Sequence, residues 1–292
     1  MPHHAIDGHV ALFLQVYIQA ETIAHIEGTR RTAMTQHKHW LSTKQGTNIK
    51  IRNMEKERLY QMIDEREGFA SLAFPALMRK VYLWMTLALA ITAVTAWGVA
   101  NSPSLLMAIY GTKYAIWGII IAELALVFTV SGAINRLSLA TATLLFTLYS
   151  VLTGVTLASI FIMYSPAIIT KVFLITAGTF GVMAVVGYTT KTDLTSLGKL
   201  MFMALLGLII ATVVNLFFIK SGSMDLIISY VGVLVFVGLT AYDSQKIKHM
   251  LMACPDASEQ AQKLALLGAL SLYLDFINLF LYLLRIFGKN ND

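Results

Sequence analysis

Residues 264–287 read LALLGALSLYLDFINLFLYLLRIF, an apolar run with one aspartate, Asp275, near its centre. A run of about 20 apolar residues is long enough to cross a bilayer as a helix. A carboxylate in the middle of such a span costs on the order of 2.5 to 3.5 kcal/mol, so something other than lipid must surround it. The run therefore predicts a membrane helix that lies inside a bundle of other helices.

The polar residues of this run recur at spacings of three and four, which places them on one face of a helix. This face consists of Ser271, Asp275, Asn278, Tyr282 and Arg285, and we name it the polar stripe. Unsatisfied polar groups in hydrocarbon cost several kcal/mol each, so the stripe must contact protein or water. The pattern predicts that the helix carrying it is central.

The chain of 292 residues has the composition of an integral membrane protein. It is 57% hydrophobic and 13% charged, whereas soluble domains carry about 25% charged residues. Long apolar runs predict an all-α fold with seven transmembrane helices, at residues 81–100, 114–131, 137–164, 168–188, 200–219, 226–242 and 264–287. The connections between these runs are short, so a catalytic domain outside the membrane is not expected.

The net charge of +6 does not indicate a nucleic-acid partner, because the basic residues after position 54 sort by loop. Eleven lie on the same side as the start of the first span: Lys56, Arg58, Arg66, Arg79, Lys80, Arg136, Lys191, Lys199, Lys246, Lys248 and Lys263. Five lie on the other side: Lys113, Lys171, Lys220, Arg285 and Lys289. Because cytoplasmic loops are enriched in Lys and Arg, we predict an N-terminus inside and a C-terminus outside.

Residues 1–53 differ in composition from the rest and hold six of the seven histidines: His3, His4, His9, His25, His37 and His39. We expect this stretch to be disordered or to come from a start codon upstream of the true one, Met54. A metal-binding role for the histidines is the less favoured alternative. Residues 54–78 are predicted to form a cytoplasmic interfacial segment, and 79–292 the membrane domain. Cys254 is the only cysteine, which excludes an intrachain disulfide.

Three carboxylates fall inside predicted spans: Glu123, Asp243 and Asp275. They are not accompanied by an HExxH, Walker or GxSxG motif, so hydrolysis by those routes is excluded and no enzyme is expected. At 1.5 Å per residue, Asp243 is predicted to lie nearer the cytoplasmic face than Asp275. Spacing alone therefore does not bring the two aspartates together.

Three motifs strongly resemble the Bax-inhibitor family of membrane proteins: GYTTKTDLTSLG (187–198), FVGLTAYDSQKIK (236–248) and LYLDFINLFLYLLRIFG (272–288). The resemblance covers about residues 54–288 and is most specific at the third motif. It implies a seven-helix fold in which the seventh helix is wrapped by the other six. The stretch before Met54 departs from the family pattern.

The resemblance also implies a calcium leak controlled by a pH-sensing aspartate pair, which falls on Asp243 and Asp275. Arg136 is the candidate for a basic residue that pairs with the first aspartate when the pore is closed. Two carboxylates about 4 Å apart repel by about 4 kcal/mol at an effective dielectric near 20, so they are expected to share a proton. Their oxygens suit calcium, which we expect as the permeant ion, with no other cofactor. We include Glu123 and Asn278 in the predicted ion pathway.

Two other readings stay open. An intramembrane aspartyl protease has a Tyr–Asp pair, as in Tyr242 and Asp243, but also needs a glycine frame before its second aspartate, where this chain has Leu272, Tyr273 and Leu274. A membrane scaffold would act through protein partners that the sequence does not specify. In that case the aspartates are structural, with Asp243 facing Lys246 or Lys248. Short loops and the C-terminal KNND favour a bacterial cytoplasmic membrane.

Overall fold

A computed structural model describes residues 49–254 and 256–288, with only the backbone described for residues 49–72 and Lys113. Seven helical stretches in these residues are long and apolar enough to cross a membrane: Ala73–Ala100, Tyr114–Ala133, Leu139–Met163, Pro166–Thr189, Thr195–Ile219, Gly222–Met252 and Glu259–Gly288. The predicted number of spans is thus confirmed. The fold is an all-α membrane bundle.

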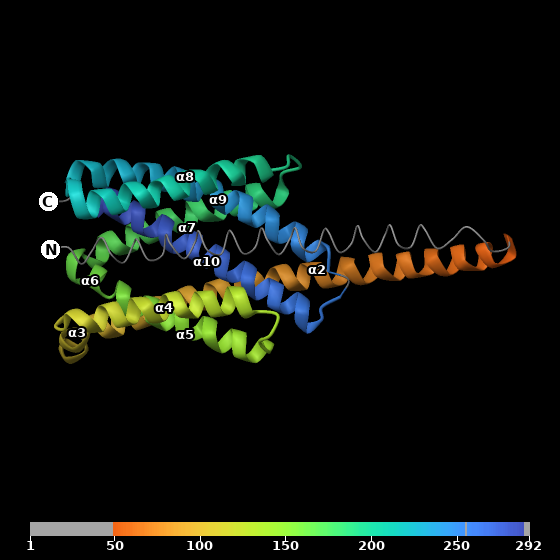
Figure 1. Ribbon diagram of the computed structural model, residues 1–292, viewed down its shortest axis with the longest axis horizontal. Coiled ribbons are helices and arrows are strands. Elements are labelled where there is room, and N and C mark those ends of the chain that lie inside the picture. Colours follow the sequence, from red (N-terminus) through yellow and green to blue (C-terminus); the bar gives the residue numbers. More distant parts are fainter. Residues whose placement is uncertain (1–48, 255, 289–292) are drawn as a thin grey trace.

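The first span is the C-terminal part of a long helix, α2 (Ile49–Ala100), which has 52 residues and contains Pro75. At 1.5 Å per residue it is about 78 Å long, more than twice the hydrocarbon thickness of a bilayer. Its N-terminal part projects beyond the other helices (Figure 1). Residues 1–48 lie outside the described residues, so the expectations for residues 1–53 stay predictions. The interfacial position of residues 54–78 also stays a prediction.

The remaining helices follow in the order α3 (Pro103–Tyr110), α4 (Lys113–Ala133), α5 (Leu139–Leu157), α6 (Ser159–Met163), α7 (Pro166–Thr189), α8 (Thr195–Val214), the π-helix η1 (Asn215–Ile219), α9 (Gly222–Met252) and α10 (Glu259–Gly288). The third span combines α5 with α6, and the fifth combines α8 with η1. Serine caps begin three of the helices, because the side chains of Ser138, Ser165 and Ser221 accept backbone N–H groups at the first turn.

Helix α10 is the most buried span, as the polar stripe predicts. In its most apolar stretch 83% is buried, compared with 56% for the third span, which ranks next. Its main neighbours are α9, α2, α7 and α5, whereas α4 packs chiefly on α5 and α8 on α9. The prediction that six helices wrap the seventh is therefore not confirmed in that form. Four spans surround α10, and α4 and α8 complete the outside of the bundle (Figure 1).

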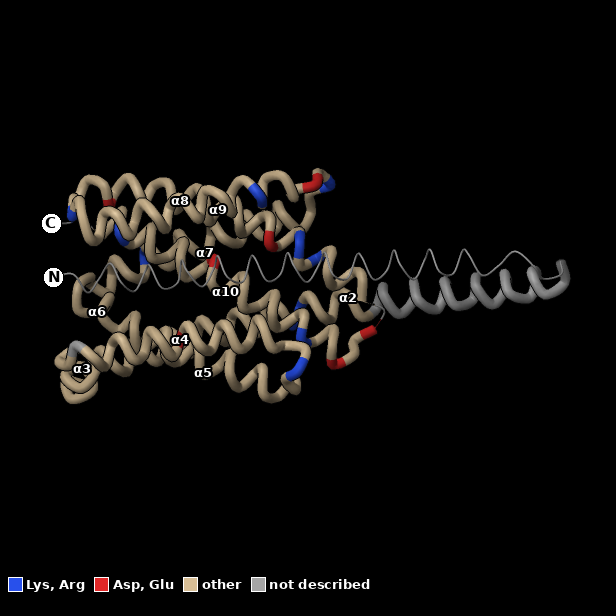
Figure 2. The backbone as a smooth tube through the Cα atoms, viewed as in Figure 1, with Lys and Arg blue, Asp and Glu red and all other residues tan. Residues whose placement is uncertain are grey.

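Charged residues gather mainly at the two ends of the bundle, and the helices between them carry few (Figure 2). Helices α4, α7 and α9 end at the same end of the bundle as the start of the first span. This end carries most of the described basic residues that were assigned to the cytoplasm, and the orientation predicted from charge stays a prediction.

We expect a reporter enzyme that is active only in the cytoplasm to be inactive when fused to the C-terminus. The physical reason is the excess of Lys and Arg on the other face, which is retained on the cytoplasmic side during insertion. The matched fusion at the N-terminal end should be active. An active C-terminal fusion in a folded protein would refute either the orientation or the odd number of spans.

Candidate functional site

The two aspartates are brought together by the register of α9 against α10. These antiparallel helices place Ile247 against Gly268 and Tyr282 against Gly232. In this register Asp243 and Asp275 lie about one helical turn apart along the helix axes. Both side chains are fully buried, and their charges interact.

Asp243 lies about one helical turn nearer the predicted cytoplasmic end than Asp275, as expected, but the ends of the two helices differ from the prediction. Helix α9 continues to Met252, ten residues beyond the predicted end at 242, and α10 begins at Glu259 rather than at 264. The extension places Asp243 inside its span instead of at its end. Hydropathy marks where the hydrocarbon ends, whereas a helix can continue into the polar region with charged residues.

Lys246 is the cation that accompanies the aspartates. Its Nζ lies 3.9 Å from Oδ1 of Asp243, and only 5% of its side chain is exposed. Its charge also interacts with that of Asp275. Asp243, Asp275 and Lys246 thus form a buried group that we name the charge triad. Lys246 was expected only as a partner of Asp243 in a structural role, although its spacing of three from Asp243 on a helix indicated the pairing.

Arg136 has a different environment. It is exposed in the turn between α4 and α5, near the cytoplasmic end predicted for the bundle. The ion pair of Asp243 in this conformation is made with Lys246 instead. A pairing of Arg136 with Asp243 in another state stays a prediction.

Helix α9 is fixed to α7 and to the turn after it around Asp243. Three side chains of α9 donate hydrogen bonds to backbone carbonyls there: Ser244 to Ala184 (2.8 Å), Gln245 to Thr192 (2.7 Å) and Lys248 to Tyr188 (2.8 Å). Hydrogen bonds of this kind also satisfy backbone groups near the end of α7. The part of α9 that directly follows Asp243 is therefore anchored to α7 and to the turn after it.

The two glycines that bound the 187–198 motif contact the residues just before Asp243. A Cβ atom at Gly187 would overlap the backbone carbonyl of Ala241, and one at Gly198 would lie 2.5 Å from the ring of Tyr242. Small residues allow helices to approach closely where lipid provides no hydrophobic driving force. The motif thus sets the position of α9 and, with it, the position of Asp243.

Gly187→Ala is expected to destabilise the protein by about 1 to 3 kcal/mol, because an added methyl group in a tight helix contact forces the backbones apart. Gly181→Ala is the matched control. Gly181 lies on the same helix, and a Cβ atom there would meet nothing within 4 Å. Thermal unfolding of both variants in detergent measures the difference. Equal midpoints would show that the α7–α9 contact is not tight.

Glu123 belongs to a second buried polar group, apart from the charge triad. Its Oε1 accepts a hydrogen bond from Thr156 at 3.0 Å, and its charge interacts with Tyr149 and Tyr273. The hydroxyl of Tyr273 lies 2.7 Å from Oγ1 of Thr92. This group joins α4 and α5 to the side of α10 that faces α2. The structure therefore separates Glu123 from the aspartates with which it was grouped.

Asn278 lies next to the charge triad along α10. It is fully buried, and its Nδ2 donates to the carbonyl of Leu274 at 2.8 Å. Of the polar stripe, Ser271, Asp275, Asn278 and Tyr282 are buried, and the guanidinium of Arg285 lies 5.7 Å from the ring centre of Tyr282. The prediction that the stripe faces protein is confirmed for these residues.

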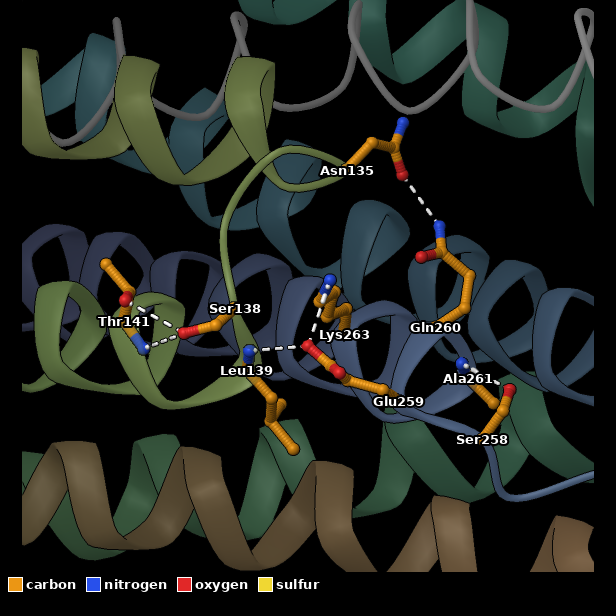
Figure 3. A network of polar contacts seen from close by, with 9 residues as sticks. All are labelled: Asn135, Ser138, Leu139, Thr141, Ser258, Glu259, Gln260, Ala261 and Lys263. Atoms are coloured by element: carbon orange, nitrogen blue, oxygen red, sulfur yellow. Dashed lines mark hydrogen bonds and ion pairs between the residues drawn. The ribbon is translucent and has the colours of Figure 1, made fainter.

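The start of α10 is joined to the turn that carries Arg136 (Figure 3). Oε1 of Glu259 accepts the backbone N–H of Leu139 at 3.0 Å and lies 3.1 Å from Nζ of Lys263. Gln260 donates to the side chain of Asn135 at 2.7 Å. A movement of the α4–α5 turn is thus coupled to the helix that carries Asp275.

The donor set is small for a resident metal ion. Within the part of the chain that the structure describes, groups of three or more His, Cys, Asp and Glu side chains that could hold a metal are absent. Calcium takes about six to eight oxygen ligands, more than two carboxylates supply. The two carboxylates alone do not complete such a set of ligands, and the predicted calcium ligation stays a prediction.

Seven membrane spans around a buried charge triad define an integral membrane protein whose ionisable groups lie inside its helical bundle. Residues 75–292 match the family described as "Inhibitor of apoptosis-promoting Bax1". The chain belongs to this Bax-inhibitor family, as the three motifs predicted.

Curated relatives cover most of the same region. The inner membrane protein YbhL of Escherichia coli strain K12 is 51% identical over 214 residues, which are 73% of this chain and 91% of that protein. An uncharacterized protein of Borreliella burgdorferi is 46% identical over 215 residues, 74% of this chain and 92% of that protein. An uncharacterized membrane protein of Streptococcus pyogenes serotype M6 is 45% identical over 175 residues, 60% of this chain and 75% of that protein.

Proposed function

We propose that this protein is a pH-sensitive calcium leak channel gated by the pair of Asp243 and Asp275. The observation that carries the proposal is the burial of two interacting carboxylates and one ammonium group inside the membrane bundle. Ionisable groups at this depth are expensive and mark ion pathways or proton relays. Membership of the Bax-inhibitor family supports the proposal, and the name of YbhL supports an inner-membrane location.

The charge balance of the triad supplies the gate. With one proton shared between the carboxylates, the two acids and Lys246 are neutral together; without that proton they carry one net negative charge. Two like charges buried in one site repel each other strongly, so the loss of the shared proton must be compensated. A calcium ion, Arg136 or a helix rearrangement is the compensating change. A rise in pH therefore favours entry of a cation.

Lys246 also acts as a competitor for the permeant ion. Its ammonium group lies against the same oxygen of Asp243 that calcium would approach. Calcium prefers charged oxygen ligands, so it gains most where the ammonium has moved away. In the described conformation the triad is a closed gate, and opening separates Lys246 from Asp243.

As such a channel, the protein catalyses no reaction. A protease would need an extended peptide to reach both carboxylates, but Leu272, Tyr273 and Leu274 before the second aspartate are fully buried. The partners are the lipid bilayer and calcium ions. A scaffold that acts through protein partners is the competing function.

The test is calcium entry into liposomes that contain the purified protein and an internal calcium dye, measured from about pH 5 to 8. We expect flux above that of protein-free liposomes and a clear dependence on pH. Asp225→Asn is the matched control, because Asp225 lies on the same helix outside the triad, and it should behave as the wild type. Folded protein with flux no greater than that of empty liposomes would refute the channel and favour the scaffold.

A further inference from the structure

An apolar groove of about 400 Å³ lies between α2 and α7 at the end of the bundle where α6 lies. Both helices pack on α10, one on each side (Figure 1). Phe276, Ile277 and Phe280 of α10 form its floor. The groove therefore gives access to the otherwise buried central helix.

Part of the α2 wall of the groove consists of small side chains, between the larger Leu89 and Trp97. Ala93 and Ala96 line it there, and Phe173 of α7 forms the opposite wall. The ring centre of Phe173 lies 5.5 Å from that of Phe276 and 6.3 Å from that of Phe280, in edge contacts. Aromatic edges hold the wall at a fixed distance from the floor.

The hydroxyl groups in the lining already have partners within the protein. Oγ1 of Thr92 donates to the carbonyl of Ser150 at 2.9 Å, and Oγ1 of Thr170 donates to the carbonyl of Pro166 at 2.8 Å. No lining residue is charged. A ligand therefore meets almost only apolar surface, and a hydrocarbon chain fits this chemistry.

The groove is continuous with the lipid-facing surface of the protein. Trp97 and Phe173 belong to its lining and are 61% and 40% exposed, respectively, on the outer faces of two membrane spans. The exposed Lys171 follows Thr170 at the same end of α7. A basic residue near the membrane surface attracts an anionic phosphate headgroup. Lipid hydrocarbon with its headgroup near Lys171 matches both features.

We propose that an acyl chain of a membrane phospholipid inserts into this groove and packs on Phe276 and Phe280 of α10. The volume falls within the range of about 300 to 1,000 Å³ that is usual for ligand sites. Phe276 directly follows Asp275, so the lipid supports the helical turn that carries the second aspartate. This site is independent of the proposed calcium flux, and its test does not use flux.

The experiment uses the full chain in liposomes that contain a phospholipid with a photoreactive diazirine on its acyl chain. After illumination, mass spectrometry is expected to find label on the 276–280 segment of α10. Ala93→Trp fills the groove and should lower this label about tenfold. Val94→Trp is the matched control, because Val94 is the next residue of α2, is exposed and does not line the groove. Its label on α10 should equal that of the wild type.

Thermal unfolding of both variants establishes that they are folded. Label on exposed residues of α8 without label on α10 would overturn the proposal, as would undiminished label on α10 in folded Ala93→Trp protein. Chemical crosslinks between two copies of the chain at α7, with α10 unlabelled, would also overturn it, because a second copy would then cover the groove.

Discussion

Calcium flux through the Asp275→Asn variant is expected to be nearly independent of pH. The remaining carboxylate, Asp243, keeps Lys246 as its ion-pair partner, and a single acid beside a cation has no proton to share over this range. Flux of the variant should change by less than about twofold between pH 5 and 8, the window in which a coupled carboxylate pair can lose its second proton. The liposome assay described above measures it.

Asp243→Asn provides the second half of this test. It also removes the shared proton, but it leaves Lys246 without its ion-pair partner. It also removes the carboxylate with which Arg136 is proposed to pair in the closed state. We therefore expect a leak that is raised at every pH. Asp275→Asn is expected to be the more severe of the two changes, because Asp275 is the deeper group and lies on the polar stripe. Survival of the wild-type pH dependence in both variants would falsify the gating mechanism.

Lys246→Met is expected to destabilise the protein by about 3 to 5 kcal/mol at pH 8, the usual cost of removing one partner from a buried charge pair. Protonated carboxyl groups do not need a counterion, whereas ionised ones do. The loss of stability should therefore grow as the pH rises and be smaller at pH 5. Thermal unfolding in detergent at both pH values measures this difference.

Lys248→Met is the matched control two residues further along α9. Lys248 donates to the carbonyl of Tyr188 and lies 5.1 Å from the centre of its ring, away from the charge triad. Its removal should cost about 1 kcal/mol, the usual value for one hydrogen bond, at either pH. If both variants respond to pH in the same way, Lys246 is not the counterion of the aspartates.

The number of spans and the burial of the last one could be predicted from the sequence. A long apolar run can satisfy its backbone groups in lipid only as a helix, and this requirement depends on nothing outside the run. In the same way, the spacing of Asp275 and Asn278 on α10 predicted a buried stripe, because helical periodicity is a local property. The three motifs added the family, which the match over residues 75–292 confirms.

The helix ends could not be predicted in this way. The charged residues after 242 continue α9 to Met252, which places Asp243 inside its span, about one helical turn from the level of Asp275. The position of Asp243 also depends on Gly187, whose missing side chain allows α7 to approach Ala241. A glycine in a motif indicates a close approach but not the helix that approaches.

The local sequence of this protein was enough to place a carboxylate inside a seven-helix membrane bundle, because apolarity and helical period act within a single segment. The interaction partners of each charged residue could be identified only from the folded structure. Packing between distant segments brings Lys246 to Asp243, leaves Arg136 in an exposed turn and places Glu123 in a separate polar group. The physical reason is that the register and the contact faces of two packed helices depend on how their side chains fit together. The sequence of one helix does not specify this fit without the other.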